Sequence, residues 1–87
     1  MAFQCDIVTP DAETFSEQVR GVVLPAHDGL VGILTGRAPM LVKLGTGELR
    51  AEVTSGTSRQ FSISGGVAQM KDNKLVVLTE QATEATV

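Results

Sequence analysis

The sequence predicts an all-β fold in which two antiparallel sheets pack face to face as a sandwich. Turn-forming residues recur about every eight to twelve positions, and no segment keeps a helical period over three turns. Between these turns, apolar residues alternate with polar ones, as in strands with one buried and one solvated face. We count about nine or ten such strands, a number and spacing typical of a sandwich or a barrel.

The first strands are separated by proline and polar turns. Residues 3–7 alternate apolar and polar side chains, so Phe3 and Ile7 are expected on one buried face. Phe15 stands alone among polar residues, as on a short edge strand. Residues 19–25 then form a β-branched run that ends at a proline, and we expect a strand there.

Residues 28–44 contain the most informative stretch of the chain. Asp28 and Gly29 form a turn dipeptide, and the apolar run at residues 30–34 is expected to be a short buried strand. A loop stiffened by Pro39 follows, and the next strand is expected at residues 40–44. A charged loop held between two apolar strands is expected to present a rigid surface.

The second half of the chain repeats this pattern of short strands and glycine turns. Residues 45–47 (Gly-Thr-Gly) are expected to form a tight connection, and Gly65-Gly66 to break or bulge a strand. Residues 72–74 are expected to form a hairpin turn, and the tail from residue 80 to be weakly helical at best. We expect strands at residues 49–53, 61–63, 67–70 and 75–78.

Length and composition indicate one folded domain. The chain has 87 residues, which gives room for a single domain, expected at residues 1–87, with a core of its own. Apolar residues make up 43% of the chain, too many for a disordered segment, and no apolar run reaches the roughly 18 residues of a membrane helix. Aromatic residues are few, and we expect Phe3, Phe15 and Phe61 to anchor the core.

The charge pattern argues against nucleic acid as a partner. The net charge is −3, and Lys and Arg are scattered between Arg20 and Lys74 rather than gathered into a stripe. The scarcity of aromatic residues also argues against a base-stacking surface. The sequence starts with no pattern typical of a secretion or transit signal, so we expect a cytoplasmic or organelle-made protein.

No set of residues points to catalysis, a metal or a cofactor. Cys5 lies between Phe3 and Ile7 in the alternating pattern, so we expect a small core residue rather than a nucleophile activated by His27. A single cysteine excludes an internal disulfide and a cysteine-based metal cluster. We therefore expect a protein that is not an enzyme and has no cofactor or small-molecule ligand.

Two other functions stay open from the residues alone. Met70 and Lys71 precede a hairpin in a small all-β domain, a feature of biotin or lipoyl carriers, which present a modified lysine at the tip of a tight turn. The second Met of that motif is absent, and Asp72 follows Lys71. The other alternative is a β-sandwich module that binds short peptides at an open strand edge.

Seven segments keep one order along nearly the whole chain: residues 6–10, 15–16, 29–34, 36–41, 44–47, 64–66 and 76–79. Together they resemble the N-terminal β-domain of the epsilon subunit of the rotary, proton-driven ATP synthase. The resemblance implies a ten-stranded antiparallel sandwich of two packed sheets. It also implies a non-catalytic subunit of the central stalk that transmits rotation of the membrane c-ring, through the gamma subunit, to the catalytic head.

The resemblance also implies where the partners bind. The complex is expected at the cytoplasmic face of a bacterial inner membrane, or at the equivalent membrane of an organelle. Leu30, Thr35 and Arg37 depart from the common motif, and we expect the chain to lack the C-terminal helical hairpin of the family. The residues expected to contact the c-ring are Asp28, Gly29, Leu30, Arg37, Ala38 and Pro39.

The gamma subunit is expected to bind the strand that follows these residues. Met40 to Leu44 is apolar on both faces except for Lys43, so a partner is expected to cover one of these faces. We therefore expect Val42 and the neighbouring Thr9 to contact the gamma subunit. The alternative is that both faces of this strand belong to the core.

Overall fold

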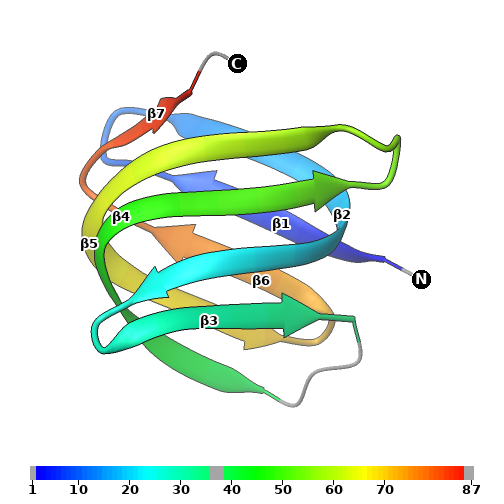
Figure 1. Ribbon diagram of the computed structural model, residues 1–87, viewed down its shortest axis with the longest axis horizontal. Coiled ribbons are helices and arrows are strands. Elements are labelled where there is room, and N and C mark those ends of the chain that lie inside the picture. Colours follow the sequence, from blue (N-terminus) through cyan, green and yellow to red (C-terminus); the bar gives the residue numbers. More distant parts are fainter. Residues whose placement is uncertain (1, 36–38, 86–87) are drawn as a thin grey trace.

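The computed structural model describes residues 2–35 and 39–85, and this part of the chain forms seven β-strands (Figure 1). An all-β fold is thereby confirmed. The strands are β1 (Phe3–Val8), β2 (Glu13–Ala26), β3 (Gly29–Leu34), β4 (Met40–Val53), β5 (Ser58–Lys71), β6 (Lys74–Leu78) and β7 (Ala82–Glu84). The described residues contain no helix long and apolar enough to cross a membrane.

Five of the strands close into a barrel-like ring. The hydrogen-bonded order runs β1–β6–β5–β4–β2, and β2 pairs back onto β1. β3 extends the sheet from β2, and β7 pairs with β5. Most pairs are antiparallel, but β1 and β6 are parallel. The expectation of purely antiparallel sheets is therefore wrong at this pair.

Three long strands explain why the structure has fewer strands than the ten expected. β2, β4 and β5 each contain 14 residues and curve around the core (Figure 1). The two halves of β2 meet different neighbours, because β2 pairs with β1 up to Val19 and with β3 from Gly21 onward. The predicted strands at 40–44 and 49–53 are one strand, β4, and those at 61–63 and 67–70 are one strand, β5. A ten-stranded sandwich of two separate sheets is therefore not what the described residues form.

The glycines expected to end strands lie inside them instead. A Cβ atom on Gly45 would come 3.1 Å from the carbonyl oxygen of Ala26, and one on Gly47 would come 3.0 Å from the Cβ of Pro25. Glycine at these two positions lets β4 pass close to β2, so the segment does not turn. β5 likewise continues through Gly65 and Gly66, although both have positive φ angles, 68° and 110°.

The core fills the inside of the ring. Phe3, Phe15 and Phe61 are all buried, which confirms their predicted role as anchors. The phenyl rings are surrounded by side chains from β1 to β6. The buried aliphatic and sulfur-containing members are Cys5, Ile7, Val19, Val22, Leu24, Ile33, Val42, Leu44, Leu49, Ala51, Val53, Ile63, Ala68, Met70, Leu75 and Val77.

Two local predictions near the C-terminus have different outcomes. The hairpin between β5 and β6 is confirmed, with Asp72 and Asn73 at φ angles of 53° and 60°. Two successive positive φ angles are typical of the type I′ turn, which matches the twist of the strands that it joins. The tail after residue 80 forms strand β7 rather than the weak helix expected.

Candidate functional site

The turn between β2 and β3 carries the first group of predicted c-ring contacts. His27 and Asp28 form the turn, and Gly29 opens β3 with a φ angle of 139°. All three residues are exposed, and the Leu30 side chain is 74% exposed. A large aliphatic side chain held in solvent beside a carboxylate gives this turn both apolar and charged surface.

The second group of predicted c-ring contacts follows the other end of β3. Pro39 is exposed and directly precedes β4, whereas Arg37 and Ala38 lie outside the described residues. Among the described residues, the β2–β3 turn and Pro39 follow opposite ends of β3 along the chain, and six strand residues span roughly 20 Å. Leu34, 66% exposed, continues the apolar surface that Leu30 begins. A partner that contacts both groups has to lie along β3.

Val42, the predicted gamma contact, is a core residue. Its side chain is 9% exposed and belongs to the buried cluster, whereas Leu41 beside it is 71% exposed. The residues of β4 alternate, so Val42 and Leu44 point inward while Leu41 and Lys43 point outward. The alternative that both faces belong to the core is wrong, and so is the choice of Val42 for the exposed face; that a partner covers this face stays a prediction. One face belongs to the core, and the outer face carries Leu41 in place of Val42.

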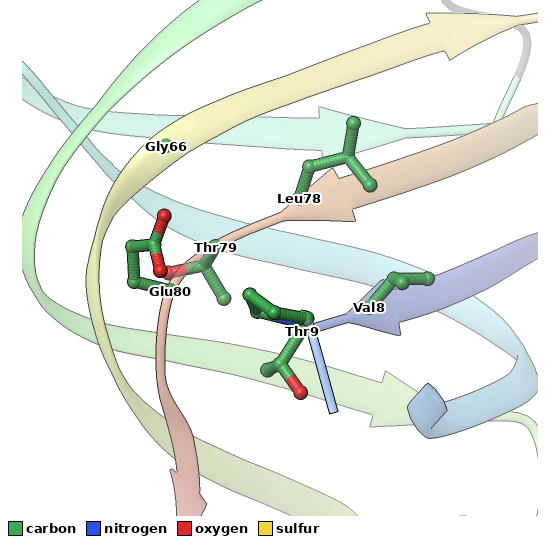
Figure 2. Close-up of a pocket in the computed structure, with 7 residues that line it drawn as sticks. Val8, Thr9, Gly66, Leu78, Thr79 and Glu80 are labelled. Carbon is green, nitrogen blue, oxygen red and sulfur yellow. The ribbon is translucent and has the colours of Figure 1, made fainter. Parts of the chain in front are cut away.

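Thr9, the other predicted gamma contact, lies at the edge of an apolar groove. It is half-buried at the end of β1, where its backbone N–H donates to the carbonyl of Ala12 at 2.9 Å. The groove measures about 320 Å³ and lies between the ends of β1 and β6 (Figure 2). Its lining residues are Val8, Thr9, Pro10, Gly66, Leu78, Thr79 and Glu80.

Strand register connects this groove to Leu41 across one sheet face. Val67 of β5 pairs with Lys43 of β4 on one side and with Leu78 of β6 on the other, and Leu78 pairs with Val8 of β1. We call this surface the outer face. It is formed by Leu41 and Lys43 of β4, Val67 and Gln69 of β5, Leu78 of β6, and Asp6 and Val8 of β1. Val67 and Leu78 on it are 38% and 48% exposed. The sequence contains a signal for this face, because residues 75–78 are apolar at successive positions, so some of them must point outward.

The polar part of the outer face is centred on Asp6. Its carboxylate accepts hydrogen bonds from the Gln4 amide and the Ser16 hydroxyl, both at 2.7 Å, and lies 3.4 Å from Lys74 Nζ. Burial alone raises the pKa of Asp6, but the hydrogen bonds from these three side chains outweigh burial and hold the pKa below its usual value. Asp6 is therefore charged at neutral pH, and its contacts link β1 to β2 and β6.

Sequence reasoning missed a second polar centre, at Arg59. Its guanidinium lies over the rings of Phe15 and Phe61 and pairs with Glu84 and, at 3.0 Å, with Glu17. These contacts join β5 to β2 and to β7. The pKa of Arg59 is raised, first by its hydrogen bond to Glu84. No local sequence pattern predicts this cluster, because its members are far apart in the sequence.

Cys5, His27 and Lys71 were considered as catalytic or carrier residues. The structure places them in the core, in a turn and at the end of a strand. Cys5 is fully buried, and burial, with the nearby charge of Asp6, raises the pKa of its thiol to about 12. His27 lies in an exposed turn. Lys71 is the last residue of β5, and Asp72 and Asn73 form the tip of the hairpin. Within residues 2–35 and 39–85, no cluster of His, Cys, Asp and Glu is suited to hold a metal ion.

Comparison with known protein families decides between the remaining interpretations. Residues 2–85 match the family model described as the β-sandwich domain of the ATP synthase delta/epsilon chain. The chain belongs to this family. The match confirms the resemblance inferred from the seven segments.

Individual relatives agree with the family match. The ATP synthase epsilon chain of Rhodopirellula baltica is 42% identical over 82 residues, which cover 94% of this chain and 63% of that one. The epsilon chain of Chlorobium limicola is 39% identical, and the match covers 94% of this chain and 93% of the relative. This chain thus spans less than two thirds of the first relative and nearly all of the second.

Solved structures have the same fold. One chain in the Euglena gracilis mitochondrial ATP synthase, a structure of its OSCP, F1 and c-ring, superposes with a TM-score of 0.89 at 25% identity. The match covers 95% of this chain and 53% of that one. A chain from the central stalk and c-ring structure of the Tetrahymena thermophila enzyme superposes with a TM-score of 0.74 at 19% identity, which shows the shared fold alone.

Proposed function

We propose that this protein is a non-catalytic subunit of the central stalk of an ATP synthase, where it transmits rotation of the c-ring to the catalytic head through the gamma subunit. The family match over residues 2–85 carries this proposal. The superposition on a chain from a structure that contains F1 and a c-ring supports it. We further propose that residues 1–87 act as one domain, with no enzyme activity of its own.

A subunit in this position must bear load without changing shape. The ring of five strands is closed by the β1–β2 pairing, so the strands that form it hydrogen-bond on both sides over part of their length. Its interior is filled by three phenyl rings and close-packed aliphatic side chains, and such interiors deform little. The fold therefore suits transmission of force rather than a conformational response.

We assign the two partners to different surfaces. The c-ring contact comprises Asp28, Gly29 and Leu30 in the β2–β3 turn, together with the segment 37–39 (Arg37, Ala38 and Pro39) beyond the other end of β3. The gamma contact comprises Thr9 and the outer face from Leu41 to Val8. Since Val42 is buried behind Leu41, the contact on β4 is assigned to Leu41.

The expected size of the gamma contact sets a requirement on this surface. Stable complexes bury on the order of 1,600 Å² in total, with an apolar centre and a polar rim. Leu41, Val67 and Leu78 supply exposed apolar surface on three neighbouring strands, and Lys43 and Gln69 supply polar surface between them. Bound in this way, the protein would lie at the membrane only through its partners, on the cytoplasmic face in a bacterium.

Co-purification with the gamma subunit of the same organism tests the proposal. The two proteins are mixed at micromolar concentration and separated on a sizing column. We expect one peak that contains both. Leu41→Asp is expected to weaken the complex while leaving the fold intact, because Leu41 is exposed. Separate elution of the wild-type chain and the gamma subunit would remove the main support for the proposal.

A further inference from the structure

Little buried apolar surface attaches β7 to the ring. This strand has three residues, Ala82–Glu84, and lies outside the ring along the first half of β5, where Thr83 pairs with Ser62 (Figure 1). Ala82 is partly buried against the core, whereas Thr83 and Glu84 are exposed. Segments with few buried apolar contacts open at a lower free energy than the strands of a core. We therefore expect β7 to open more easily than the ring.

An ion pair holds β7 where apolar burial does not. The Arg59 guanidinium on β5 binds both carboxylate oxygens of Glu84, through Nε to Oε2 and through Nη2 to Oε1, the second contact at 2.8 Å. A pair with two parallel hydrogen bonds is stronger and more directional than a single hydrogen bond. Next to it, the Ala85 backbone N–H donates to the carbonyl of Gln60 at 2.8 Å. These contacts hold the end of β7 that is farther from β6 along the chain.

The position of Arg59 does not depend on β7. Its Nη1 lies 3.0 Å from the Glu17 carboxylate on β2, and its guanidinium carbon lies over the rings of Phe15 and Phe61. All three of these residues belong to strands of the ring. If Glu84 moves away, the cation keeps a carboxylate partner and two aromatic faces that attract it. Arg59 therefore stays in place to bind Glu84 again.

Thr79 fixes the start of the segment between β6 and β7 to the ring. Its side chain is 5% exposed, and its backbone N–H donates to the carbonyl of Val8 at 3.1 Å. Its hydroxyl accepts from the Ser64 N–H and donates to the carbonyl of Gln81, both at 3.3 Å. A hydroxyl has one hydrogen and two lone pairs, so it makes both contacts at once. Movement of β7 can therefore begin only after Thr79, at Glu80 and Gln81, which are both exposed.

We propose that β7 is a strap that opens and closes while the ring stays intact, with Thr79 as its hinge and the Arg59–Glu84 pair as the clasp that holds it closed. Opening leaves the edge of β5 at residues 60–63 without a partner strand. An unpaired strand edge can accept an extended segment of another chain. The closed strap therefore protects this edge. The inference does not depend on the proposed function.

Hydrogen exchange of backbone amides, followed by NMR, tests the strap in the intact chain. Protection factors are compared for residues 82–85 in the strap, for Ser64 at the hinge, and for the paired residues of β4 and β5 in the ring. Glu84→Gln removes the charge of the clasp. Glu48→Gln is the matched control at an exposed glutamate on β4, which forms no ion pair within residues 2–35 and 39–85. The wild-type chain and Glu84→Gln are also measured at increasing salt.

We expect the protection factors of the strap to be at least about tenfold lower than those of the ring, and Ser64 to be protected like the ring. Glu84→Gln should lower the protection of the strap a further two- to fivefold, roughly the range for exposed ion pairs, and leave the ring unchanged. Glu48→Gln should change neither the strap nor the ring. Added salt should lower the protection of the strap in the wild-type chain and much less in Glu84→Gln, because salt screens the ion pair.

Three results would overturn the inference. Equal protection of residues 82–85 and the ring would show that β7 opens only when the whole ring opens, so that it is not a strap. Exchange of Ser64 at the rate of the strap would show that Thr79 is not the hinge. If Glu84→Gln leaves the strap unchanged, or Glu48→Gln lowers its protection as much, the Arg59–Glu84 pair is not the clasp.

Discussion

The rings of Phe15 and Phe61 meet edge to face, with their centroids 5.2 Å apart and their planes at 65°. The contact joins β2 to β5 across the core, and the Arg59 guanidinium carbon lies 5.3 and 5.9 Å from the two centroids. In a chain with three aromatic residues, this pair is a large share of the aromatic surface available to the core. It holds together two strands that are 14 residues long and must curve without separating.

Truncation of Phe15 should therefore strongly destabilise the protein. Phe15→Ala removes a ring that is 4% exposed and leaves a cavity, so we expect the free energy of unfolding to fall by about 3–5 kcal/mol. Phe15→Leu keeps most of the volume and should cost less. Urea unfolding monitored by circular dichroism measures both. A loss below about 1 kcal/mol for Phe15→Ala would mean that the pair does not contribute to the core as described.

The close approach of β5 and β6 predicts that Gly66 cannot be replaced. Gly66→Ala forces a side chain into the Leu78 carbonyl at a positive φ angle, and we expect a loss of more than about 3 kcal/mol or failure to fold. Gly32→Ala is the matched control, because a Cβ atom there meets nothing within 4 Å. It should change stability by no more than about 0.5 kcal/mol. Equal stability of the two variants would contradict the strand packing.

The hydrogen bonds around Asp6 predict a specific loss of stability in acid. Because the folded-state pKa lies below the unfolded value, the carboxylate stabilises the fold above the unfolded pKa, about 3.9, and this contribution is lost as the pH falls through the folded pKa. Asp6→Asn should lower stability at neutral pH and flatten the decline in acid. Urea unfolding at several pH values between about 7 and 3 measures this. An unchanged decline in the variant would exclude Asp6 as its source.

Burial of Cys5 predicts a thiol that does not react in the folded protein. Since burial raises its pKa to about 12, the thiolate is absent at neutral pH, and the side chain is also closed to reagents. A thiol reagent such as Ellman's reagent should label the protein only after unfolding in urea. The denatured protein is the control for reagent quality. Rapid labelling of the native protein would show that β1 opens easily or that Cys5 is misplaced.

Alternation of apolar and polar residues was sufficient to predict the all-β class and the buried faces of most strands. Phe3, Cys5 and Ile7 point inward as the pattern of residues 3–7 indicates, and the hairpin at Asp72 and Asn73 follows from turn chemistry. These features depend on neighbours in the sequence. The local signal is therefore enough for them.

The strand count was wrong because glycine has two structural uses that look alike in a sequence. Gly45 and Gly47 have the composition of a turn, yet they serve to let β4 cross close to Pro25 and Ala26. The parallel pairing of β1 and β6 is also invisible locally, because it joins opposite ends of the chain. Features that depend on contacts between distant segments could not be derived from spacing.

The candidate site residues show the same difference between features that depend on neighbouring residues and features that depend on distant segments. Asp28 and Gly29 are exposed, as a turn dipeptide predicts. The expectation of a buried strand at residues 30–34 is wrong, because β3 lies at the end of the sheet beside β2, and Leu30 and Leu34 on it are 74% and 66% exposed. Val42 is buried because the inward face of β4 is decided by its register against β5, where Val42 pairs with Ala68. Because residues 40–44 are apolar on both faces except at Lys43, the sequence alone did not decide which face of this part of β4 points into the core. The groove at Thr9 depends on three strands and appears only in the fold.

Proton pumping tests the central claim of mechanical coupling most directly. ATP synthase of the same organism, prepared without its epsilon chain and reconstituted in vesicles, is supplied with ATP, and proton uptake is followed with a pH-sensitive dye. The account predicts that adding this 87-residue chain restores ATP-driven proton uptake, and that Leu78→Asp restores much less at the same concentration. Binding of the wild-type chain to the enzyme with no gain in proton uptake would contradict a role in coupling.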